Sequence, residues 1–245
     1  MNQMTREKVM QYAKYRWPYS TDACQFIIET ADVSQGVVAD VGAGTGLLTQ
    51  HFVGKVKKVF AIEPELEMRN FAHGFIGDRQ DIDYIDGVAE NTTLESHSVD
   101  LIIAANAYHR FQPEPTLNEF RRILKPNGML AVFSYHDEHN FVRDTLRVCN
   151  NEHYNQRLTA TRHEEPVQYF YGDAISSRYL FTQEQSETWD DYWGAIGAGM
   201  ESPDESEEWF ITFQEAHRQR FNDMATSGRI TVKYSTEVWL GQPNY

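Results

Sequence analysis

Cysteine, basic residues and long apolar runs are all scarce in this sequence of 245 residues. The two cysteines, Cys24 and Cys149, form no C-x-x-C pattern, which argues against a cysteine-based zinc site and for a reducing compartment. Thirty-six acidic residues against 22 basic ones give a net charge of −14, which disfavours a nucleic acid as partner. Residues 1–17 are too polar for a signal peptide, and no stretch approaches the roughly eighteen apolar residues of a membrane span. We therefore expect a cytoplasmic protein with no membrane partner.

The sequence also lacks internal repeats, low-complexity tracts and Gly/Ser-rich linkers, so we expect a single domain over residues 1–245. Its first part alternates short apolar runs with helix-length segments. Such alternation predicts an α/β fold whose parallel sheet is covered on both faces. Two helices are expected ahead of the first strand, and another helix from Leu47. The predicted strands are residues 37–41, 58–63, 82–85, 99–105 and 129–135.

The character of the sequence changes after Tyr135. Residues 136–205 are rich in aromatic and charged side chains, and Thr182-Gln183-Glu184-Gln185 has the pattern of a helix capping box. We expect a long helix from about Asp204 to Ser227, ended by Gly228. The alternating residues 229–240 predict an added antiparallel strand.

A glycine loop, Asp40-Val41-Gly42-Ala43-Gly44-Thr45-Gly46, follows the first predicted strand. Glycines allow a tight turn and a close approach of the backbone to a ligand. Leu47 stands where the nicotinamide fingerprint needs a third glycine, so that fingerprint is not met. Glu63 ends the second strand, where a carboxylate can accept hydrogen bonds from both ribose hydroxyls. Gly87-Val88-Ala89-Glu90 follows the third strand, in a position to border an adenine.

Together with Asn106 after the fourth strand and Leu124-Lys125-Pro126-Asn127-Gly128 before the fifth, these motifs resemble the class I S-adenosylmethionine-dependent methyltransferases. The likeness is greatest to the small-molecule type 11 group that includes trans-aconitate methyltransferase-like enzymes. It is strong over roughly residues 34–135 and extends to Tyr15-Arg16-Trp17-Pro18-Tyr19 and to residues 227–236. It implies a three-layer, Rossmann-like sheet of seven strands in the order 3-2-1-4-5-7-6, mostly parallel with the last strand antiparallel, and an α-rich cap inserted after strand 5.

The resemblance also implies how the chain is divided. Residues 1–33 would form N-terminal helices over the methyl-donor site, and residues 34–135 the donor-binding core. Residues 136–205 would form the cap that binds the acceptor, and residues 206–245 the last helix and strand that complete the sheet.

The cofactor implied by the resemblance is S-adenosylmethionine, with S-adenosylhomocysteine as its product. Asp40 would orient the glycine loop or reach the methyl donor's amino group, Glu63 would hold the ribose hydroxyls, and Arg16 would pair with the methionine carboxylate. Val88 departs from the family pattern, in which an aspartate is common at this position. The expected cofactor-binding residues are Asp40, Gly42, Ala43, Gly44, Glu63, Pro64, Ala89, Glu90, Asn106, Arg16 and Tyr15.

Methyl transfer from a sulfonium depends chiefly on alignment, and needs a general base only if the acceptor must lose a proton. His109 is the candidate base or orienting residue, and a packing role is equally open. We expect no metal site, because the neighbouring residues His136-Asp137-Glu138-His139 rarely converge on one ion. The candidate acceptor-binding residues, each also compatible with packing, are Tyr108, His136, His139 and Trp193.

The sequence thus predicts an enzyme that methylates an oxygen or nitrogen of a small-molecule acceptor. Two alternatives stay open. One is a donor-binding relative that does not methylate, such as a cyclase, a decarboxylase or a regulatory protein. The other is a nucleic-acid or protein methyltransferase, which the net charge of −14 and the sequence Asn106-Ala107-Tyr108-His109 disfavour. The identity of the acceptor and the oligomeric state do not follow from the sequence.

Overall fold

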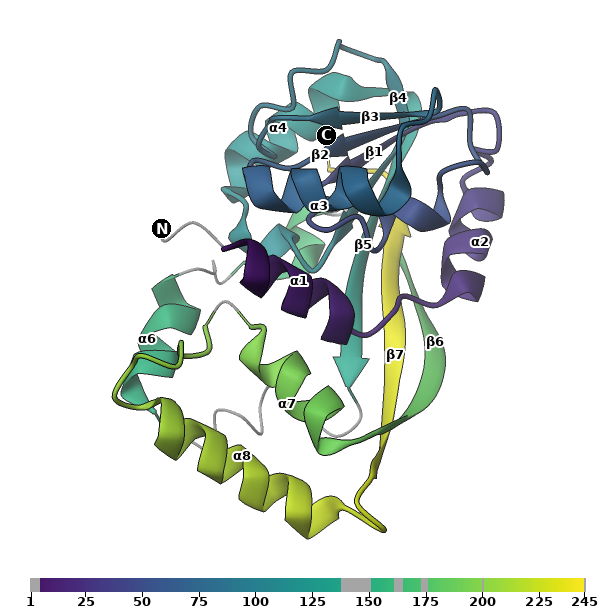
Figure 1. Cartoon of the computed structure of the whole chain (residues 1–245). Coiled ribbons are helices and arrows are strands. Elements are labelled where there is room, and N and C mark those ends of the chain that lie inside the picture. The colour runs from purple at the N-terminus through teal and green to yellow at the C-terminus, as the bar shows by residue number, and fades with distance from the viewer. Residues whose placement is uncertain (1–4, 138–150, 161–164, 173–175, 200, 245) are drawn as a thin grey trace.

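The computed structural model describes residues 5–137, 151–160, 165–172, 176–199 and 201–244. A seven-stranded sheet with the order β3-β2-β1-β4-β5-β7-β6 forms its centre (Figure 1). Strands β1 to β5 pair in parallel, and β7 runs antiparallel to both β5 and β6, which confirms the expected topology. The strands are β1 Val37–Val41, β2 Lys58–Ile62, β3 Ile82–Ile85, β4 Val99–Ala105, β5 Leu124–Asp137, β6 Ser176–Glu187 and β7 Ile230–Gly241.

Helices and turns cover both faces of the sheet. On one face α2 (Thr21–Thr30) packs with the short 3-10 helix η1 (Thr49–His51), and α3 (Leu66–Ile76) follows β2. On the other face lie α4 (Pro113–Ile123) and the 3-10 helix η3 (Val167–Phe170). The central strand β4 is buried on both sides because nearly all its residues are apolar.

The N-terminal helix α1 (Arg6–Tyr15) connects the two halves of the molecule. It contacts α3 above and α7 (Trp189–Gly197) below (Figure 1). Around α7 lie α6 (Glu152–Ala160) and α8 (Phe210–Met224), beside the long lower ends of β5, β6 and β7 (Figure 1). These elements lie on the side of the sheet where the parallel strands end.

Two local predictions are wrong. No α-helix begins at Leu47: the chain forms only the 3-10 turn η1, since Thr49 turns its hydroxyl to the carboxylate of Asp40 and Gly54 adopts a positive φ of 79° shortly afterwards. The residues Thr182–Gln185 lie in β6 and not at a helix start. Their hydroxyl and amide groups belong to a two-residue alternation, and Thr182 hydrogen-bonds Ser235 across the sheet at 3.0 Å.

The capping box lies six residues later in the chain. The Thr188 side chain accepts from the backbone of Asp191, whose carboxylate accepts from Thr188 in return, and α7 begins there. The expected long helix is α8, which is shorter than predicted. The division of the chain into core and cap stays a prediction, and the strand β6 lies inside the segment 136–205 assigned to the cap.

A cluster of aromatic rings joins α7 to α8. Trp189 stacks on Trp193 with ring centres 5.7 Å apart, and the Tyr192 hydroxyl hydrogen-bonds Nδ1 of His217 at 3.1 Å. His217 is only 1% exposed, and its Nε2 has no hydrogen-bond partner in the described part of the chain. Burial among these rings lowers the pKa of His217 to about 4, so the histidine is neutral at pH 7.

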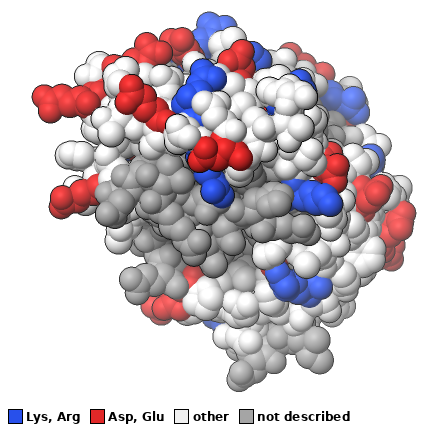
Figure 2. All heavy atoms as spheres, turned by 90° about the horizontal axis from the view of Figure 1, so that it is seen from below, with Lys and Arg blue, Asp and Glu red and all other residues white. Residues whose placement is uncertain are grey.

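One face of the molecule shows charges of both signs. Acidic and basic side chains both occur among the described residues of the face in Figure 2. Across the described ranges, every helix is too short or too polar to cross a membrane.

The buried His217 predicts a specific acid sensitivity. The unfolded chain binds a proton at this histidine near pH 6.5 and the folded chain only near pH 4, so the stability tied to His217 is lost as the pH falls through this window. The loss amounts to about 3 kcal/mol at full protonation. Denaturant titrations between pH 4 and 7 measure it. His217→Asn should flatten the pH dependence, whereas His136→Asn, at an exposed position on β5, should leave it as in the wild type. Parallel curves for all three proteins would contradict the prediction.

Candidate functional site

The glycine loop lies between β1, β2 and the turn that follows β4. The backbone N–H groups of Gly42 and Ala43 both donate to the carbonyl of Ile62, at 2.9 and 3.0 Å. Gly42 has a φ of 74°, and a Cβ there would lie 2.7 Å from Cβ of Ala107. A side chain at position 42 is therefore excluded both by the backbone conformation and by the turn after β4.

Asp40, near the end of β1, is fully buried below this loop. One carboxylate oxygen, Oδ2, accepts from the Thr49 hydroxyl at 2.6 Å. The other oxygen, Oδ1, is buried and has no hydrogen-bond partner in the described part of the chain. Burial raises the pKa of Asp40 to about 7, with the Thr49 hydrogen bond opposing the rise and the charge of Glu63 adding to it. An unsatisfied buried oxygen at this position is a feature that a bound cationic or N–H group would complete.

Glu63 directly follows β2 and is 8% exposed. Its Oε2 accepts from the backbone of Gly44 at 2.9 Å, and its Oε1 from the backbone of Glu65 at 3.0 Å. Burial raises the pKa of Glu63, and the two backbone hydrogen bonds oppose the rise. Each oxygen has a second lone pair, so the carboxylate can still accept from two hydroxyl groups.

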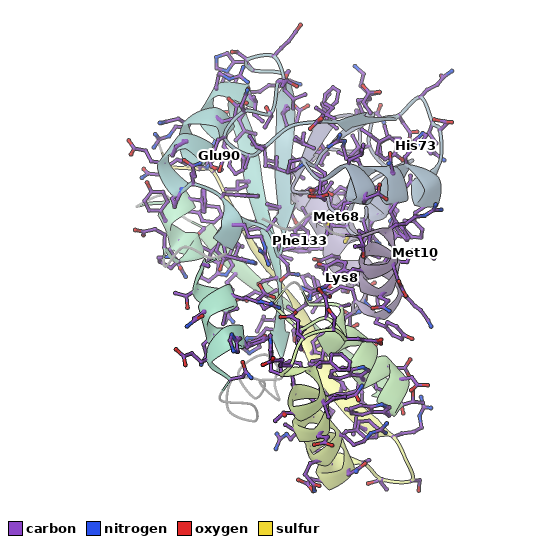
Figure 3. The ribbon with its side chains drawn as sticks, turned by 60° about the vertical axis from the view of Figure 1, so that its left-hand side comes forward. Lys8, Met10, Met68, His73, Glu90 and Phe133 are labelled. Atoms are coloured by element: carbon purple, nitrogen blue, oxygen red, sulfur yellow. The ribbon has the colours of Figure 1, made fainter. Side chains whose placement is uncertain are left out.

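The residues expected around an adenine form the outer wall of this region. Arg69 donates to the carbonyls of Glu63 and Pro64 at 2.7 and 2.8 Å, which fixes the chain between β2 and α3. Met68 of the same helix points toward the loop: its sulfur would lie 3.7 Å from a Cβ at Gly44 (Figure 3). Ala89 is buried, whereas Val88 is 40% exposed.

Glu90 has a structural role that the sequence did not suggest. Its Oε1 accepts from the backbone N–H of Gln112 at 2.6 Å, where α4 begins (Figure 3). The side chain therefore ties the loop after β3 to the start of α4, and any contact with an adenine edge must share that oxygen or use the other one.

Asn106, directly after β4, is held in a conformation that is rare for a residue other than glycine. Its φ is 49°, its backbone N–H donates to Phe133 at 2.9 Å, and its side-chain amide donates to the Tyr19 hydroxyl at 2.8 Å. Tyr19 in turn stacks on Tyr135 with ring centres 4.8 Å apart. The backbone strain of a positive φ at Asn106 persists only where surrounding contacts enforce it, and residues with such strain concentrate at functional sites.

Arg16 belongs to the same cluster. Its guanidinium lies over the rings of Tyr12 and Tyr135, at 5.2 and 5.1 Å from the ring centres. Its Nε is buried and lacks a hydrogen-bond partner within the described residues. Tyr15, by contrast, packs against α7, since a Cβ at Gly194 would lie 2.4 Å from its ring.

The candidate catalytic and acceptor-binding residues are spread over several places. His109 and Tyr108 lie in the 3-10 helix η2 (Tyr108–Arg110), with their rings 5.7 Å apart. Trp193 is part of the aromatic cluster between α7 and α8, and His136 is exposed on β5. His139 lies outside the described residues.

Tyr108 also lines a cavity of about 300 Å³ between η2, η3 and the strands β5, β6 and β7. Its other lining residues are Val132, Ser134, Pro166, Val167, Gln168, Arg178, Glu237 and Trp239. A larger, more open cavity of about 680 Å³ lies between α3 and β3. None of the residues lining that larger cavity is an expected site residue, whereas the smaller one includes the candidate acceptor-binding residue Tyr108.

Sequence reasoning missed Thr49, Tyr135 and the contact between Arg110 and Glu201, which are 2.9 Å apart. Tyr19 was part of a recognised motif, but its contact with Asn106 was not foreseen. The only available signal for Tyr135 was its place at the end of the fifth predicted strand.

Residues 39–132 match the methyltransferase domain family. The chain is 29% identical to a protein of Dictyostelium discoideum that is named as a methyltransferase. The match runs over 150 residues, which are 60% of this chain and 54% of that one. A protein of Anaeromyxobacter dehalogenans described as a type II methyltransferase superposes with a TM-score of 0.62 at 18% identity, over 93% of this chain and 97% of that one. The precorrin 8w decarboxylase of Methanobacterium thermoautotrophicum superposes with a TM-score of 0.50 at 13% identity, over 98% of both chains.

The chain spans about half the length of the curated relatives it matches. The structural neighbours share the fold, and the trans-aconitate methyltransferase-like subgroup stays a prediction. The sequence of its core and its strand order are those expected of the class I S-adenosylmethionine-dependent methyltransferases.

Proposed function

We propose that this protein transfers a methyl group from S-adenosylmethionine to an oxygen or nitrogen of a small-molecule acceptor. The observation that carries the proposal is the pair of buried carboxylates, Asp40 and Glu63, on either side of the glycine loop. One oxygen of Asp40 has no partner in the described chain, and Glu63 already orders the loop through Gly44. Buried, incompletely satisfied carboxylates of this kind favour a ligand that brings hydroxyl and ammonium groups.

The chain's own groups match the parts of this cofactor. Glu63 is suited to accept from the ribose hydroxyls, and Oδ1 of Asp40 to accept from the amino group, directly or through a water molecule. The guanidinium of Arg16 is suited to pair with the methionine carboxylate, because its buried Nε lacks a partner in the described chain. The left-handed conformation of Asn106 fixes the backbone directly after β4, and the carbonyl of this residue is our candidate to accept from the methionine amino group.

When bound, S-adenosylmethionine supplies an electrophilic methyl group on a positively charged sulfur. The protein then has to hold the acceptor in line with that methyl group, which can contribute about 7–11 kcal/mol to lowering the barrier. His109 lies in the turn η2, between Tyr108 and Arg110, and is our candidate for removing a proton from an acceptor hydroxyl or ammonium group.

We assign the acceptor to the cavity beside Tyr108. Its walls combine apolar and aromatic side chains with four polar or charged ones, Ser134, Gln168, Arg178 and Glu237. Small-molecule sites commonly combine an apolar lining with a few polar groups. The Glu237 side chain is 15% exposed, forms an ion pair with Arg178, and receives hydrogen bonds from Ser134 and Trp239. The net charge of −14 favours a neutral or cationic acceptor over a polyanionic one.

A second candidate is a relative that binds the methyl donor but carries out another reaction. It is favoured by one structural neighbour, described as a precorrin 8w decarboxylase. Incubation with labelled S-adenosylmethionine and a metabolite extract separates the two candidates: formation of S-adenosylhomocysteine with label in the small-molecule fraction supports methyl transfer, and binding without that product supports the alternative.

Loss of the Glu63 carboxylate should weaken binding of S-adenosylhomocysteine by about ten- to a hundredfold, since hydrogen bonds to a charged group are worth about 1.5–3 kcal/mol. Isothermal titration calorimetry of Glu63→Ala measures this. Glu95→Ala, at an exposed position, is the control and should bind as the wild type does. Unchanged affinity in a folded Glu63→Ala protein would contradict the assigned ribose contact.

The affinity for S-adenosylhomocysteine should depend on pH through Asp40. The pKa of this carboxyl is raised to about 7, so below pH 7 it is largely protonated and accepts poorly from an ammonium group. Affinity should therefore rise with pH, by up to roughly tenfold per unit, and level off above about pH 7. Asp40→Asn should remove this dependence, and a pH profile shared by both proteins would show that Asp40 does not contact the amino group.

If His109 is the general base, His109→Ala should lower turnover by about 10²- to 10⁴-fold while leaving the affinity for S-adenosylhomocysteine unchanged. Label transfer to the small-molecule fraction measures turnover, and His73→Ala on α3 is the control histidine. Wild-type turnover in His109→Ala would assign His109 to packing alone.

A further inference from the structure

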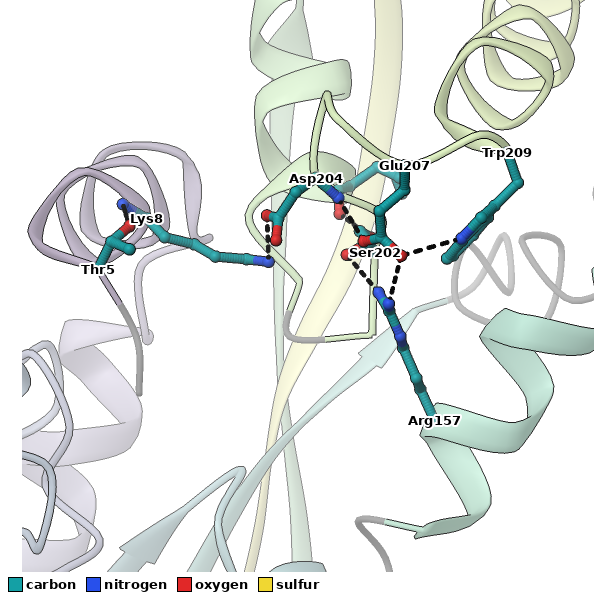
Figure 4. A network of polar contacts seen from close by, with 8 residues as sticks. Thr5, Lys8, Arg157, Ser202, Asp204, Glu207 and Trp209 are labelled. Atoms are coloured by element: carbon teal, nitrogen blue, oxygen red, sulfur yellow. Dashed lines mark hydrogen bonds and ion pairs between the residues drawn. The ribbon is translucent and has the colours of Figure 1, made fainter. Parts of the chain in front are cut away.

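The segment between α7 and α8, residues 201–209, which we call the strap, carries five carboxylates. Three of them pair with a basic side chain, each from a different element. Glu201 pairs with Arg110 of η2 at 2.9 Å, Asp204 with Lys8 of α1 at 3.1 Å, and Glu207 with Arg157 of α6 at 2.5 Å. Figure 4 shows the last two pairs, with Trp209 donating to Glu207. The strap therefore joins the N-terminal helix, the lower helices and the turn after β4.

These three pairs differ in burial. The side chains of Glu201 and Arg110 are 8% and 28% exposed, whereas Asp204 is 67% exposed. Exposed ion pairs contribute little because water and salt screen them, but a buried carboxylate depends on its cation. Glu201 also lies close enough to Arg16 for their charges to interact. Of the three pairs, Glu201–Arg110 is thus the one in which the carboxylate can hold the arginine in a fixed position.

The strap begins in a fixed position. Directly after α7, the Ser202 hydroxyl donates to the carbonyl of Ile196 at 2.6 Å, and the Ser202 backbone donates to Gly199 at 3.1 Å. Ser202 is buried, so this turn leaves Glu201 little freedom to follow a moving partner.

Arg110 is the last residue of the turn η2, which also contains His109. This turn lies against the glycine loop. Before the turn, Asn106 is fixed by its contact with Tyr19. The next residue, Ala107, lies close enough to the glycine loop to exclude a side chain at Gly42. These two contacts are made by Tyr19 and by the glycine loop. The contact of Arg110 with Glu201 is made by the other half of the molecule. The position of Arg110, at the end of the turn, therefore depends on the strap.

We propose that Glu201 is a positioning residue: through Arg110 it fixes the Tyr108–Arg110 turn, and with it His109, against the glycine loop. This inference rests on the proposed function, because the turn matters for catalysis only if the loop binds the methyl donor. It makes the donor site sensitive to the attachment of the strap, a coupling between two parts of the fold for which several-fold changes in affinity are usual.

The experiment compares Glu201→Gln and Arg110→Gln with the control Asp204→Asn, which removes the exposed pair of the same strap without touching η2. Amide hydrogen exchange at residues 107–111 of the free protein should be about fivefold or more faster in Glu201→Gln and Arg110→Gln. Binding of S-adenosylhomocysteine should weaken by a similar factor. The double variant should be no worse than either single one, because both remove the same contact. Asp204→Asn should stay within about twofold of the wild type in both measurements.

Equal effects in Asp204→Asn and Glu201→Gln would overturn the proposal, because they would mean that any loosening of the strap has the same result. Additive effects in the double variant would also overturn it. If the wild type fails to bind S-adenosylhomocysteine, the proposed function fails, while the exchange rates of the free protein still test the positioning role directly.

Discussion

Two carboxylates, Asp40 and Glu63, are buried at the ends of neighbouring strands, and the interior must compensate for their charge. The compensation comes from the Thr49 hydroxyl and from the backbone N–H groups of Gly44 and Glu65. The Thr49 hydroxyl comes from the 3-10 turn that follows the loop, and Gly44 donates its N–H from a left-handed conformation, with a φ of 57°, which favours glycine. The local form of the loop is thus set by the need to satisfy these carboxylates, and one oxygen of Asp40 is still left for a ligand.

The order of the strands then decides what else reaches this loop. Since β1 lies between β2 and β4, the loop after β1 faces the chain after β2 on one side and the turn after β4 on the other. Glu63 comes from the first of these and Asn106 from the second. The two residues thus lie on opposite sides of the loop, because parallel strands present their carboxyl ends at one edge of the sheet.

The apolar strands and the motif residues attached to them could be predicted because each signal lies within a few neighbouring residues. Asp40, Glu63 and Asn106 are candidates that such local signals indicate. The strand β6 was missed, because its polar two-residue alternation from Ser176 to Glu187 includes Thr182-Gln183-Glu184-Gln185, which has the spacing of a helix cap. The contacts of Tyr19 with Asn106 and of Glu201 with Arg110 join residues 87 and 91 positions apart. No local pattern encodes such pairs, which follow from the packing of the two halves.

The helix α1 makes these two halves interdependent. It packs on α3 beside the glycine loop and on α7, where the ring of Tyr15 fits against Gly194 and allows no side chain there. Arg16, at the end of the same helix, extends over Tyr135 of the sheet toward the region assigned to the methionine carboxylate. A displacement of α7 would therefore move α1, and a displacement of α1 would move Arg16. Because rigid, tightly packed elements transmit shifts and absorb few of them, binding at the methyl-donor site and the position of the aromatic helices cannot vary independently.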